Sequence, residues 1–380
     1  MIDQSILTKL PSPAWLLEES LLERNVDILD SIQQKSGAKI LLALKGYALW
    51  GSFDTISNRL HGCCASGLWE AKLAYEEFGG EVHTYSPAFR DSEIDEIANI
   101  SDHIVFNTPQ QFQKYLKRVK DINPKLSLGI RINPEYSESP AEIYNPCGLY
   151  SRLGTTLDNF DESILDSCDG FHLHALCEQG ADALESLLDI FEDKFGSYLY
   201  ALKWINFGGG HHITKEGYDT EKLISLIERF KSKYQVDIYL EPGEAVGWQT
   251  GTLVATVLDI VYNGIDIAIL DISAEAHMPD TIIMPYRAEV RGASGAGVKR
   301  YTYRLGGNSC LAGDVMGDYS FDRPLEIGDR VVFEDQMHYT MVKTTTFNGI
   351  ELPSICILKR DNSLEIVREF EYKDFRDRLS

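Results

Sequence analysis

Eight short β-rich runs alternate with longer amphipathic stretches through residues 39–242 of the 380-residue chain. The runs are rich in apolar and β-branched side chains and comprise Lys39–Lys45, Cys63–Ser66, Glu81–Ser86, His103–Asn107, Ser127–Asn133, Phe171–Leu176, Lys203–Gly208 and Asp237–Pro242. In the stretches between them, such as 68–78, 109–119 and 220–234, apolar residues recur at three- and four-residue spacing, which is typical of helices. Eight strands alternating with helices predict a (β/α)₈ barrel.

The pattern changes after about residue 245. Further strands with few helices between them are predicted at 252–261, 265–272, 301–305, 330–334 and 354–358, with Gly and Asp at the turns. The apolar run at 13–17 precedes the first helix and could add a strand to this region. We therefore expect an α/β chain in three parts. These are an N-terminal segment (1–30) that partly pairs with the β domain, a barrel (31–245) and a C-terminal β-rich domain (246–380).

Composition narrows the functional classes. The formal net charge is −22 at pH 7, and such a surface repels the phosphates of nucleic acids. No window of about eighteen apolar residues is present, which predicts no membrane-spanning helix. The N-terminus, Met1-Ile2-Asp3-Gln4, lacks the charged and apolar regions of a signal peptide, so a cytoplasmic location is expected. The seven cysteines have irregular spacing without a C-x-x-C pair, which supports neither a disulfide framework nor a zinc ribbon.

Lys45 ends the first apolar run and is followed by Gly46-Tyr47. A lysine that closes a barrel strand lies at the C-terminal rim, where such barrels carry their chemistry. Partial desolvation there would lower the pKa of the amine and make it able to form an imine. Taken alone, a strand-end lysine that extends into solvent is the more common arrangement.

Two other strand ends carry residues that could bind a phosphate and a pyridine ring. Phe207-Gly208-Gly209-Gly210 follows the seventh run, and its backbone N–H groups could approach a phosphate closely. A triple glycine can equally be a mobile turn. Glu241-Pro242-Gly243-Glu244 closes the eighth run, and its first carboxylate could accept a hydrogen bond from a protonated pyridine nitrogen. The alternative is an ordinary Pro-Gly turn.

The sixth run contains Phe171-His172-Leu173-His174. Strand alternation points both histidines to the same face, where one could stack on an aromatic cofactor. No third ligand lies at a telling distance, so no metal is expected there. A core histidine is the alternative. Each of these features is weak by itself, but all of them occur at strand ends of one predicted barrel.

In this order, Lys45, His174, the triple glycine and Glu241-Pro242-Gly243 resemble the alanine-racemase-type pyridoxal-phosphate (PLP) decarboxylases. This family includes ornithine and diaminopimelate decarboxylases, and the resemblance covers nearly the whole chain. It implies a PLP-binding barrel followed by a C-terminal β domain. It also implies a homodimer with active sites at the interface between subunits.

The resemblance implies a role for each matching residue. Lys45 would hold PLP as a Schiff base, His174 would stack on its ring, Arg131 would lie close to the ring and Glu241 would pair with the ring nitrogen. The residues implied at the phosphate are Gly208, Gly209, Gly210 and Tyr339, and Gly243 is implied to bind the cofactor. Cys310 resembles the cysteine that is supplied across the interface and helps to protonate the substrate carbon.

The chain departs from ornithine and diaminopimelate decarboxylases at two informative places. Their Gly-Ser after the stacking histidine is replaced by Ala175-Leu176-Cys177-Glu178, and their Arg after Glu-Pro-Gly is replaced by Glu244. The second change inverts the local charge, which disfavours an additional substrate carboxylate and favours an amine. These variants, with Ala276–Asp280 and the altered Ser309–Asp314 motif, resemble the branch that decarboxylates carboxynorspermidine and carboxyspermidine.

The resemblance therefore predicts PLP-dependent decarboxylation of carboxynorspermidine, carboxyspermidine or both, giving norspermidine or spermidine in polyamine biosynthesis. Glu244, Asp280 and Asp314 would contact the ammonium groups of this small cationic substrate, although the two aspartates are equally well explained as solvated loop acids. Two alternatives stay open: an ornithine- or diaminopimelate-type decarboxylase, and a non-catalytic regulator like the antizyme inhibitors. Glu244 argues against the diaminopimelate version, and retention of Lys45 and Cys310 argues against the regulator.

Overall fold

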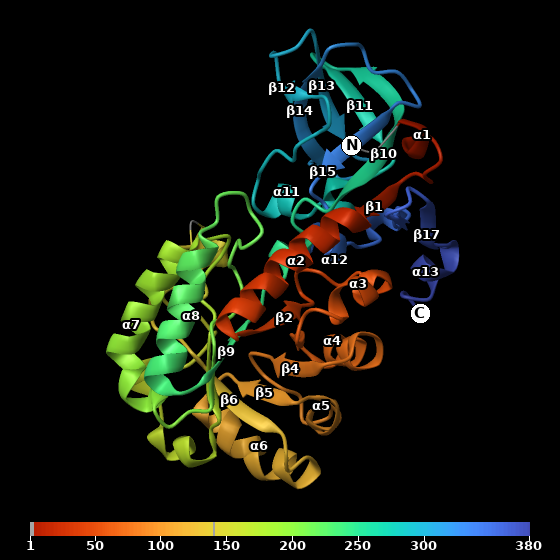
Figure 1. Cartoon of the computed structure of the whole chain (residues 1–380). Helices are drawn as coiled ribbons and strands as arrows, with labels where there is room; N and C mark the ends of the chain where they lie inside the picture. The colour runs from red at the N-terminus through yellow and green to blue at the C-terminus, as the bar shows by residue number, and fades with distance from the viewer. Residues whose placement is uncertain (1–3, 140) are drawn as a thin grey trace. The chain divides into compact units, whose positions relative to one another are not determined.

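The chain forms two compact units (Figure 1). One unit comprises Glu23–Val246, and the other comprises the N-terminal segment through Leu22 together with Gly247–Ser380. The computed structural model describes residues 4–139 and 141–380. Residues 1–3, on which part of the signal-peptide expectation rests, and residue 140 lie outside this description.

The first unit is built around a closed barrel of eight parallel strands, which confirms the predicted (β/α)₈ architecture. Its strands are β2 (Lys39–Ala43), β3 (Gly62–Ala65), β4 (Glu81–Tyr85), β5 (His103–Phe106), β6 (Ser127–Ile132), β7 (Gly170–Leu173), β8 (Trp204–Asn206) and β9 (Asp237–Leu240). The ring closes where β2 pairs with β9, through Lys39 opposite Tyr239 and Ile40 opposite Leu240. The first strand is shorter than predicted, and Lys45 lies in the turn that follows it.

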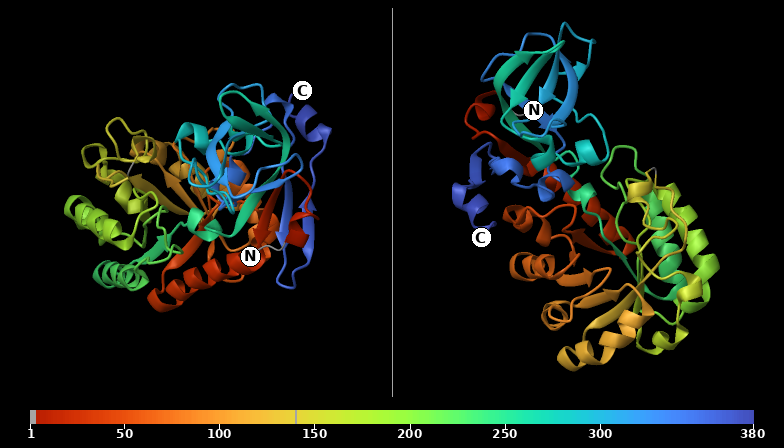
Figure 2. Two further views of the ribbon diagram at one scale, coloured as in Figure 1. Left: turned by 90° about the horizontal axis from the view of Figure 1, so that it is seen from above. Right: turned by 180° about the vertical axis from the view of Figure 1, so that it is seen from behind.

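Helices lie outside the ring of strands (Figure 2). They are α2 (Glu19–Ser36), α3 (Phe53–Ser57), α4 (Leu68–Leu73), α5 (Ile94–Ile100), α6 (Pro109–Ile122), α7 (Ala181–Leu199), α8 (Thr220–Tyr234) and the short α9 (Glu244–Gly247), with a π-helical turn η2 (Ala74–Phe78) and 3₁₀ turns η1 (Trp50–Ser52), η3 (Glu142–Tyr144), η4 (Leu157–Asn159) and η5 (Glu162–Ser167). Within the described ranges, no helix combines the length and the apolar character needed to cross a membrane.

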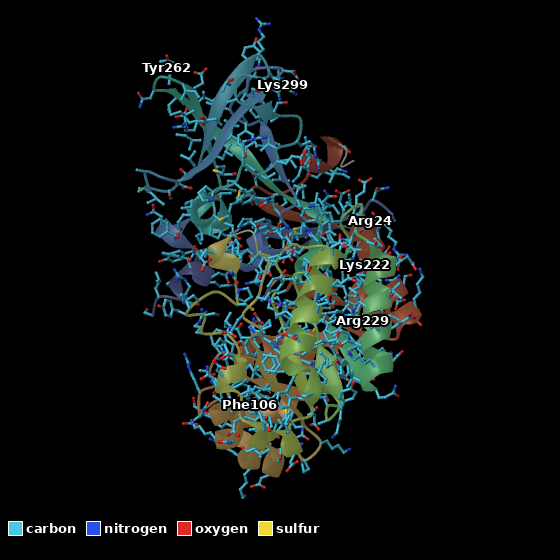
Figure 3. All side chains as sticks on the ribbon, turned by 90° about the vertical axis from the view of Figure 1, so that its left-hand side faces the viewer. Arg24, Phe106, Lys222, Arg229, Tyr262 and Lys299 are labelled. Carbon is cyan, nitrogen blue, oxygen red and sulfur yellow. The ribbon has the colours of Figure 1, made fainter. Side chains whose placement is uncertain are left out.

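Sequence explains how two of these helices form. Thr108 caps α6, because its side chain accepts the Gln111 N–H, and Pro109 occupies the first turn, where its missing N–H costs nothing. Along α8, apolar residues face the barrel and charged ones face outward. Lys222 and Arg229 project from the same side of α8 (Figure 3) and form ion pairs with acids of α7. These surface pairs orient the two helices but contribute little stability.

Trp204 packs inside the barrel near the amino ends of the strands, where its indole N–H donates to Ser127, the first residue of β6. Its indole packs with Leu41, Val105 and Tyr239 in the interior. A Cβ added to Gly170 would lie 2.0 Å from this indole, and one added to Gly129 would lie 2.4 Å from it. The two glycines of β6 and β7 therefore provide the space that the large ring of β8 occupies.

The second unit contains a nine-stranded sheet in the order β12-β14-β13-β11-β10-β1-β16-β17, with β15 paired to β10. Its strands are β1 (Ala14–Glu18), β10 (Gly251–Tyr262), β11 (Asp266–Leu270), β12 (Ser294–Gly295), β13 (Tyr301–Gly306), β14 (Val315–Phe321), β15 (Arg330–Glu334), β16 (Ser354–Leu358) and β17 (Leu364–Arg368). The short helices are α1 (Gln4–Leu7), α10 (Ala274–His277), α11 (Asp280–Ile283), α12 (Tyr339–Val342) and α13 (Tyr372–Arg376), with the 3₁₀ turn η6 (Phe347–Gly349).

The N-terminal strand β1 belongs to the interior of this sheet. It pairs antiparallel with β10 and parallel with β16. Its Leu16 side chain packs with Val254, Val332 and Cys356 in a buried apolar cluster. Segments from both ends of the chain thus share one core.

We expect Gly170→Ala to lower the free energy of unfolding by about 1–3 kcal/mol, because the added methyl group would overlap the buried Trp204 ring. Urea denaturation of the purified protein measures this change. Gly196→Ala is the matched control, since the nearest atom to its new Cβ is Tyr234 Oη at 3.6 Å and the site lies within α7. The control should gain about 0.5–1 kcal/mol from helix propensity. Equal stability of the two variants would contradict this account.

Candidate active site

Polar side chains gather at the carboxyl ends of the barrel strands. Lys45 follows β2, His174 follows β7, Gly208 follows β8 and Glu241 follows β9. Because all eight strands are parallel, these positions surround one mouth of the barrel. The structure therefore brings together the barrel residues that the sequence singled out.

Lys45 contacts His174 directly, with 3.2 Å between Nζ and Nε2. His174 Nδ1 lies 2.9 Å from the Gly209 nitrogen and 3.1 Å from the Gly209 carbonyl oxygen, which holds the ring against the glycine-rich turn. Burial lowers the pKa of Lys45, and the nearby Arg131 charge lowers it further, even though solvent reaches the side chain through the open mouth. A neutral amine is a nucleophile that can attack a carbonyl carbon.

Glu241 is held as a buried anion. Its Oε2 lies 3.0 Å from His172 Nε2, and its Oε1 accepts Asn206 Nδ2 at 2.7 Å. Burial alone would raise the pKa of Glu241, but His172 outweighs it, and the pKa falls to about 2. Burial also lowers the pKa of His172, which favours its neutral form. A buried carboxylate with two neutral donors is suited to pair with a cationic N–H group.

Asn206 and the role of His172 were not identified from the sequence. Both residues point into the barrel because strand alternation places them on the interior face, as it does Glu241 on the neighbouring strand. In the sequence, each is visible only as a polar residue near the end of an otherwise apolar strand. Their role can be assigned only when the strand register shows that both side chains reach the Glu241 carboxylate.

Arg131 is hydrogen-bonded to the backbone at His174, just after strand β7. Its Nη2 donates to the His174 carbonyl oxygen at 3.0 Å, and its guanidinium lies 4.8 Å from the centre of the Tyr85 ring. Tyr85 in turn donates to Asn107 Oδ1 at 2.8 Å. This buried cation sits next to the Lys45 amine and helps to keep that amine neutral.

The triple glycine is required by close packing. A Cβ at Gly208 would lie 2.6 Å from His174, one at Gly209 would lie 2.4 Å from the Glu241 carbonyl oxygen, and one at Gly210 would lie 2.1 Å from the Leu176 carbonyl oxygen. The N–H groups of Gly208 and Gly209 already donate to Asn206 and His174. Among the hydrogen bonds found in the described residues, none uses the Gly210 N–H, which leaves it available to an anion.

The turn of Lys45 packs on the turn that follows β9. A Cβ at Gly46 would lie 2.9 Å from the Glu244 nitrogen, and one at Gly243 would lie 2.9 Å from the Ala43 carbonyl oxygen. The half-buried Glu244 side chain lies 3.8 Å from His212 Nε2. Burial raises the pKa of the Cys177 thiol to about 11, and Glu244 and Lys45 both act on that thiol electrostatically. Glu244 therefore borders the mouth that contains Lys45.

Four of the predicted site residues belong to the second unit. Cys310 is exposed, and its N–H donates to Asn348 Oδ1 at 2.6 Å. Lys343 links two others, because its Nζ lies 2.8 Å from both Asp280 oxygens and 5.3 Å from the centre of the Tyr339 ring.

Asp314, the fourth of these residues, is buried within its own loop. Its two carboxylate oxygens accept the N–H groups of Ala274 at 2.6 Å and Ser309 at 3.1 Å. The acid thus organises the backbone around the altered cysteine motif. These hydrogen bonds favour a role for Asp314 in holding its loop together over direct contact with a ligand.

The barrel, the lysine at its mouth and the added sheet together define a class of protein. The family model described as "Pyridoxal-dependent decarboxylase, C-terminal sheet domain" matches residues 28–336, and the chain belongs to this family of carboxy-lyases. The resemblance deduced from the motifs is thereby confirmed.

Comparison with individual relatives shows which members of this family the chain is most similar to in the matches found. The chain is 55% identical to a carboxynorspermidine/carboxyspermidine decarboxylase of Campylobacter jejuni, over 97% of this chain and 98% of the other. It is 46% identical to a carboxyaminopropylagmatine decarboxylase of Synechocystis, over 100% of this chain and 98% of the other. A solved carboxynorspermidine decarboxylase of C. jejuni complexed with norspermidine has a TM-score of 0.91 and 53% identity, covering 97% of this chain and 99% of that one.

Glu241→Gln keeps the size of the side chain but removes its negative charge. If Glu241 pairs with the pyridine nitrogen, we expect the Kd for pyridoxal phosphate to rise by about 10- to 100-fold, the value of a hydrogen bond to a charged group. Titration of the cofactor-free protein, followed by absorbance, measures this Kd. Glu221→Gln, which alters an exposed acid of α8, serves as the control. Equal affinities in the two variants would show that Glu241 does not reach the ring.

Proposed function

We propose that the chain uses pyridoxal 5'-phosphate, attached to Lys45, to decarboxylate carboxynorspermidine, carboxyspermidine or both, releasing norspermidine or spermidine. One observation carries the proposal: the mouth that pairs Lys45 with the anionic Glu241 also contains the acid Glu244. The names of the relatives at 55% and 40% identity support the same reaction.

The residues of the mouth fit the cofactor that the family requires. Bound PLP supplies an electron sink for the charge left on the substrate carbon when CO₂ departs. In this proposal Lys45 Nζ holds the cofactor covalently and His174 stacks against the ring. Glu241 keeps a proton on the ring nitrogen, and that proton is what makes the sink effective.

The phosphate of the cofactor is assigned to the glycine-rich turn. The Gly210 N–H is the first candidate donor, because Gly208 and Gly209 already use their N–H groups within the protein. Tyr339 stays in the proposal as a further phosphate contact, and Gly243 as a residue that binds the cofactor. Cys310 Sγ is the proposed acid that returns a proton to the substrate carbon, consistent with its exposed position.

Specificity for a polyamine is assigned first to Glu244. Its carboxylate is half-buried at the barrel mouth, where it can pair with an ammonium group. Asp280 forms an ion pair with Lys343, and both oxygens of Asp314 accept backbone N–H groups. Because Glu244 borders the mouth that contains Lys45, it is the acid whose substitution should most clearly alter substrate binding.

A second candidate substrate is carboxyaminopropylagmatine. The relative of that name is 46% identical over the whole chain, and a guanidinium group would also suit an acidic mouth. Diaminopimelate and lysine/ornithine decarboxylases of known structure are only 15–16% identical, and their similarity reflects the fold alone. The homodimer with active sites at the interface and the cytoplasmic location remain predictions.

The direct test is CO₂ release by the purified holoenzyme with carboxynorspermidine, carboxyspermidine, carboxyaminopropylagmatine, ornithine and diaminopimelate in parallel. We expect the highest kcat/KM with one or both of the first two. A preference for carboxyaminopropylagmatine would transfer the assignment to that substrate, and a preference for ornithine or diaminopimelate would overturn it. Lys45→Ala should lose both activity and the visible absorbance of the lysine-bound cofactor. If the wild-type protein itself lacks that absorbance, the result would favour a non-catalytic regulator like the antizyme inhibitors.

Glu244→Gln should raise KM for carboxynorspermidine by about tenfold or more, because a neutral amide pairs more weakly with an ammonium group. The value of kcat should change much less, since the contact is present in both ground and transition states. Steady-state kinetics measures both values. Glu178→Gln is the matched control, because Glu178 is an exposed acid in a nearby turn. If the two variants have the same KM, Glu244 makes no specific substrate contact.

A further inference from the structure

Tyr85 is the last residue of β4, so it lies at the same end of the barrel as Lys45. Its ring contacts two groups on which the proposed site depends. The Arg131 guanidinium lies 4.8 Å from the centre of the ring, and the centre of the His172 ring lies 5.5 Å away at an interplanar angle of 60°. A single aromatic side chain thus contacts both the cation beside Lys45 and the histidine that bonds to Glu241.

Arg131 is a buried cation without an acidic partner. It is 4% exposed, and none of the ion pairs found within the described ranges involves it. A buried guanidinium is costly unless other groups replace its hydration. Two groups that do so are the His174 carbonyl oxygen, which accepts Nη2 at 3.0 Å, and the face of the Tyr85 ring. The position of this charge therefore depends on where the Tyr85 ring lies.

The hydroxyl group fixes the orientation of the Tyr85 ring. It donates to Asn107 Oδ1 at 2.8 Å. Asn107 is itself buried, and its side-chain amide bonds to the Gly154 N–H at 2.7 Å and to the Arg152 carbonyl oxygen at 2.9 Å. Burial raises the pKa of Tyr85, so the hydroxyl keeps its proton and can donate it to Asn107. The ring therefore presents a neutral π face to Arg131.

His172 depends on neighbouring rings for its orientation. Its Nε2 lies 3.0 Å from Glu241 Oε2, and its buried Nδ1 has no hydrogen-bond partner in the part of the chain that the structure describes. An imidazole with a single hydrogen bond can turn about that contact unless packing confines it. Tyr85 packs against this ring in an edge-to-face arrangement, which is a favourable geometry for two aromatic rings. Tyr85 thus limits how far His172 can turn away from the carboxylate.

We propose that Tyr85 is a positioning residue for the cofactor site. Its ring holds the Arg131 charge beside the Lys45 nitrogen. It also holds His172 against the Glu241 carboxylate. This inference rests on the proposed function, because it takes Lys45 as the residue that carries the cofactor. A positive charge held beside the Lys45 nitrogen disfavours protonation of that nitrogen, so removal of the aromatic ring should make it easier to protonate.

Several other groups act electrostatically on the lysine nitrogen. After burial, Arg131 has the largest effect on the pKa of the amine, and Cys64, Glu241 and Cys177 oppose it. Burial raises the pKa of both thiols, and the pKa of Glu241 is about 2. Burial also lowers the pKa of His174, whose Nε2 lies 3.2 Å from the lysine. These groups keep their charge near neutral pH, so displacement of Arg131 is the change that a pH titration should detect.

The test is a pH titration of the visible absorbance of the lysine-bound cofactor in purified holoenzyme. Tyr85→Leu removes the aromatic face and should raise the midpoint by about half a pH unit or more, because Arg131 is no longer held beside the nitrogen. The Kd for pyridoxal phosphate should also rise by about threefold, the value of an edge-to-face contact with His172. Tyr85→Phe keeps the ring, so its midpoint should stay close to that of the wild type.

Tyr115→Leu is the matched control. Tyr115 is a buried residue of α6, outside the ring of strands, and its hydroxyl donates to the Phe89 carbonyl oxygen at 3.1 Å. This change also removes a packed tyrosine but should leave the midpoint at the wild-type value. If Tyr85→Leu does not fold, Tyr85→Met takes its place, because methionine also lacks a π face. In protein that carries Arg131→Gln, Tyr85→Leu should cause no additional shift, since the charge that it positions is absent.

Three outcomes would overturn the inference. A midpoint in Tyr85→Leu equal to that of the wild type would show that the ring does not position the charge. An equal shift in Tyr115→Leu would identify general destabilisation, and a full shift in the Arg131→Gln background would show that Tyr85 acts by another route. Wild-type holoenzyme without the visible absorbance would instead overturn the proposed function, and this inference with it.

Discussion

Closure of the barrel between its first and last strands is the constraint on which the site depends. Pairing of β2 with β9 brings residues 40 and 240 side by side, and a hydrogen bond of 3.0 Å joins the Ala43 N–H to the Pro242 carbonyl oxygen. Gly46 and Gly243 allow the two following turns to pack backbone against backbone. As a result, the Lys45 turn lies against the turn that contains Glu241 and Glu244, although about two hundred residues separate them in sequence.

The surroundings of each group in the mouth give Lys45 and Glu241 different charge states. Lys45 is shifted toward its neutral form by desolvation and by Arg131, whereas Glu241 stays anionic because His172 and Asn206 bond to it. A neutral amine is a nucleophile, and a buried anion is a partner for a cationic ring nitrogen. The two groups need different surroundings, and separate barrel strands supply them.

The barrel could be predicted because its evidence is local. Eight apolar runs at regular intervals, with helical periodicity between them, are visible without any knowledge of contacts. The strand-end positions of Lys45, His174 and Glu241 followed from those runs. Asn206 and Tyr85 were missed because a polar residue on an apolar strand has no specific meaning until strand register identifies its neighbour.

By itself, the sequence determined the order of strands and helices, the family and the chemical types of the residues at each strand end. These properties depend on side-chain periodicity and on motifs, and both lie within short stretches of chain. Only the tertiary structure decided that Gly208 and Gly209 are needed for packing and already use their N–H groups, and that Asp314 organises its own loop. Such facts depend on atoms distant in sequence that approach within a few ångströms, and barrel closure and sheet register alone set those distances.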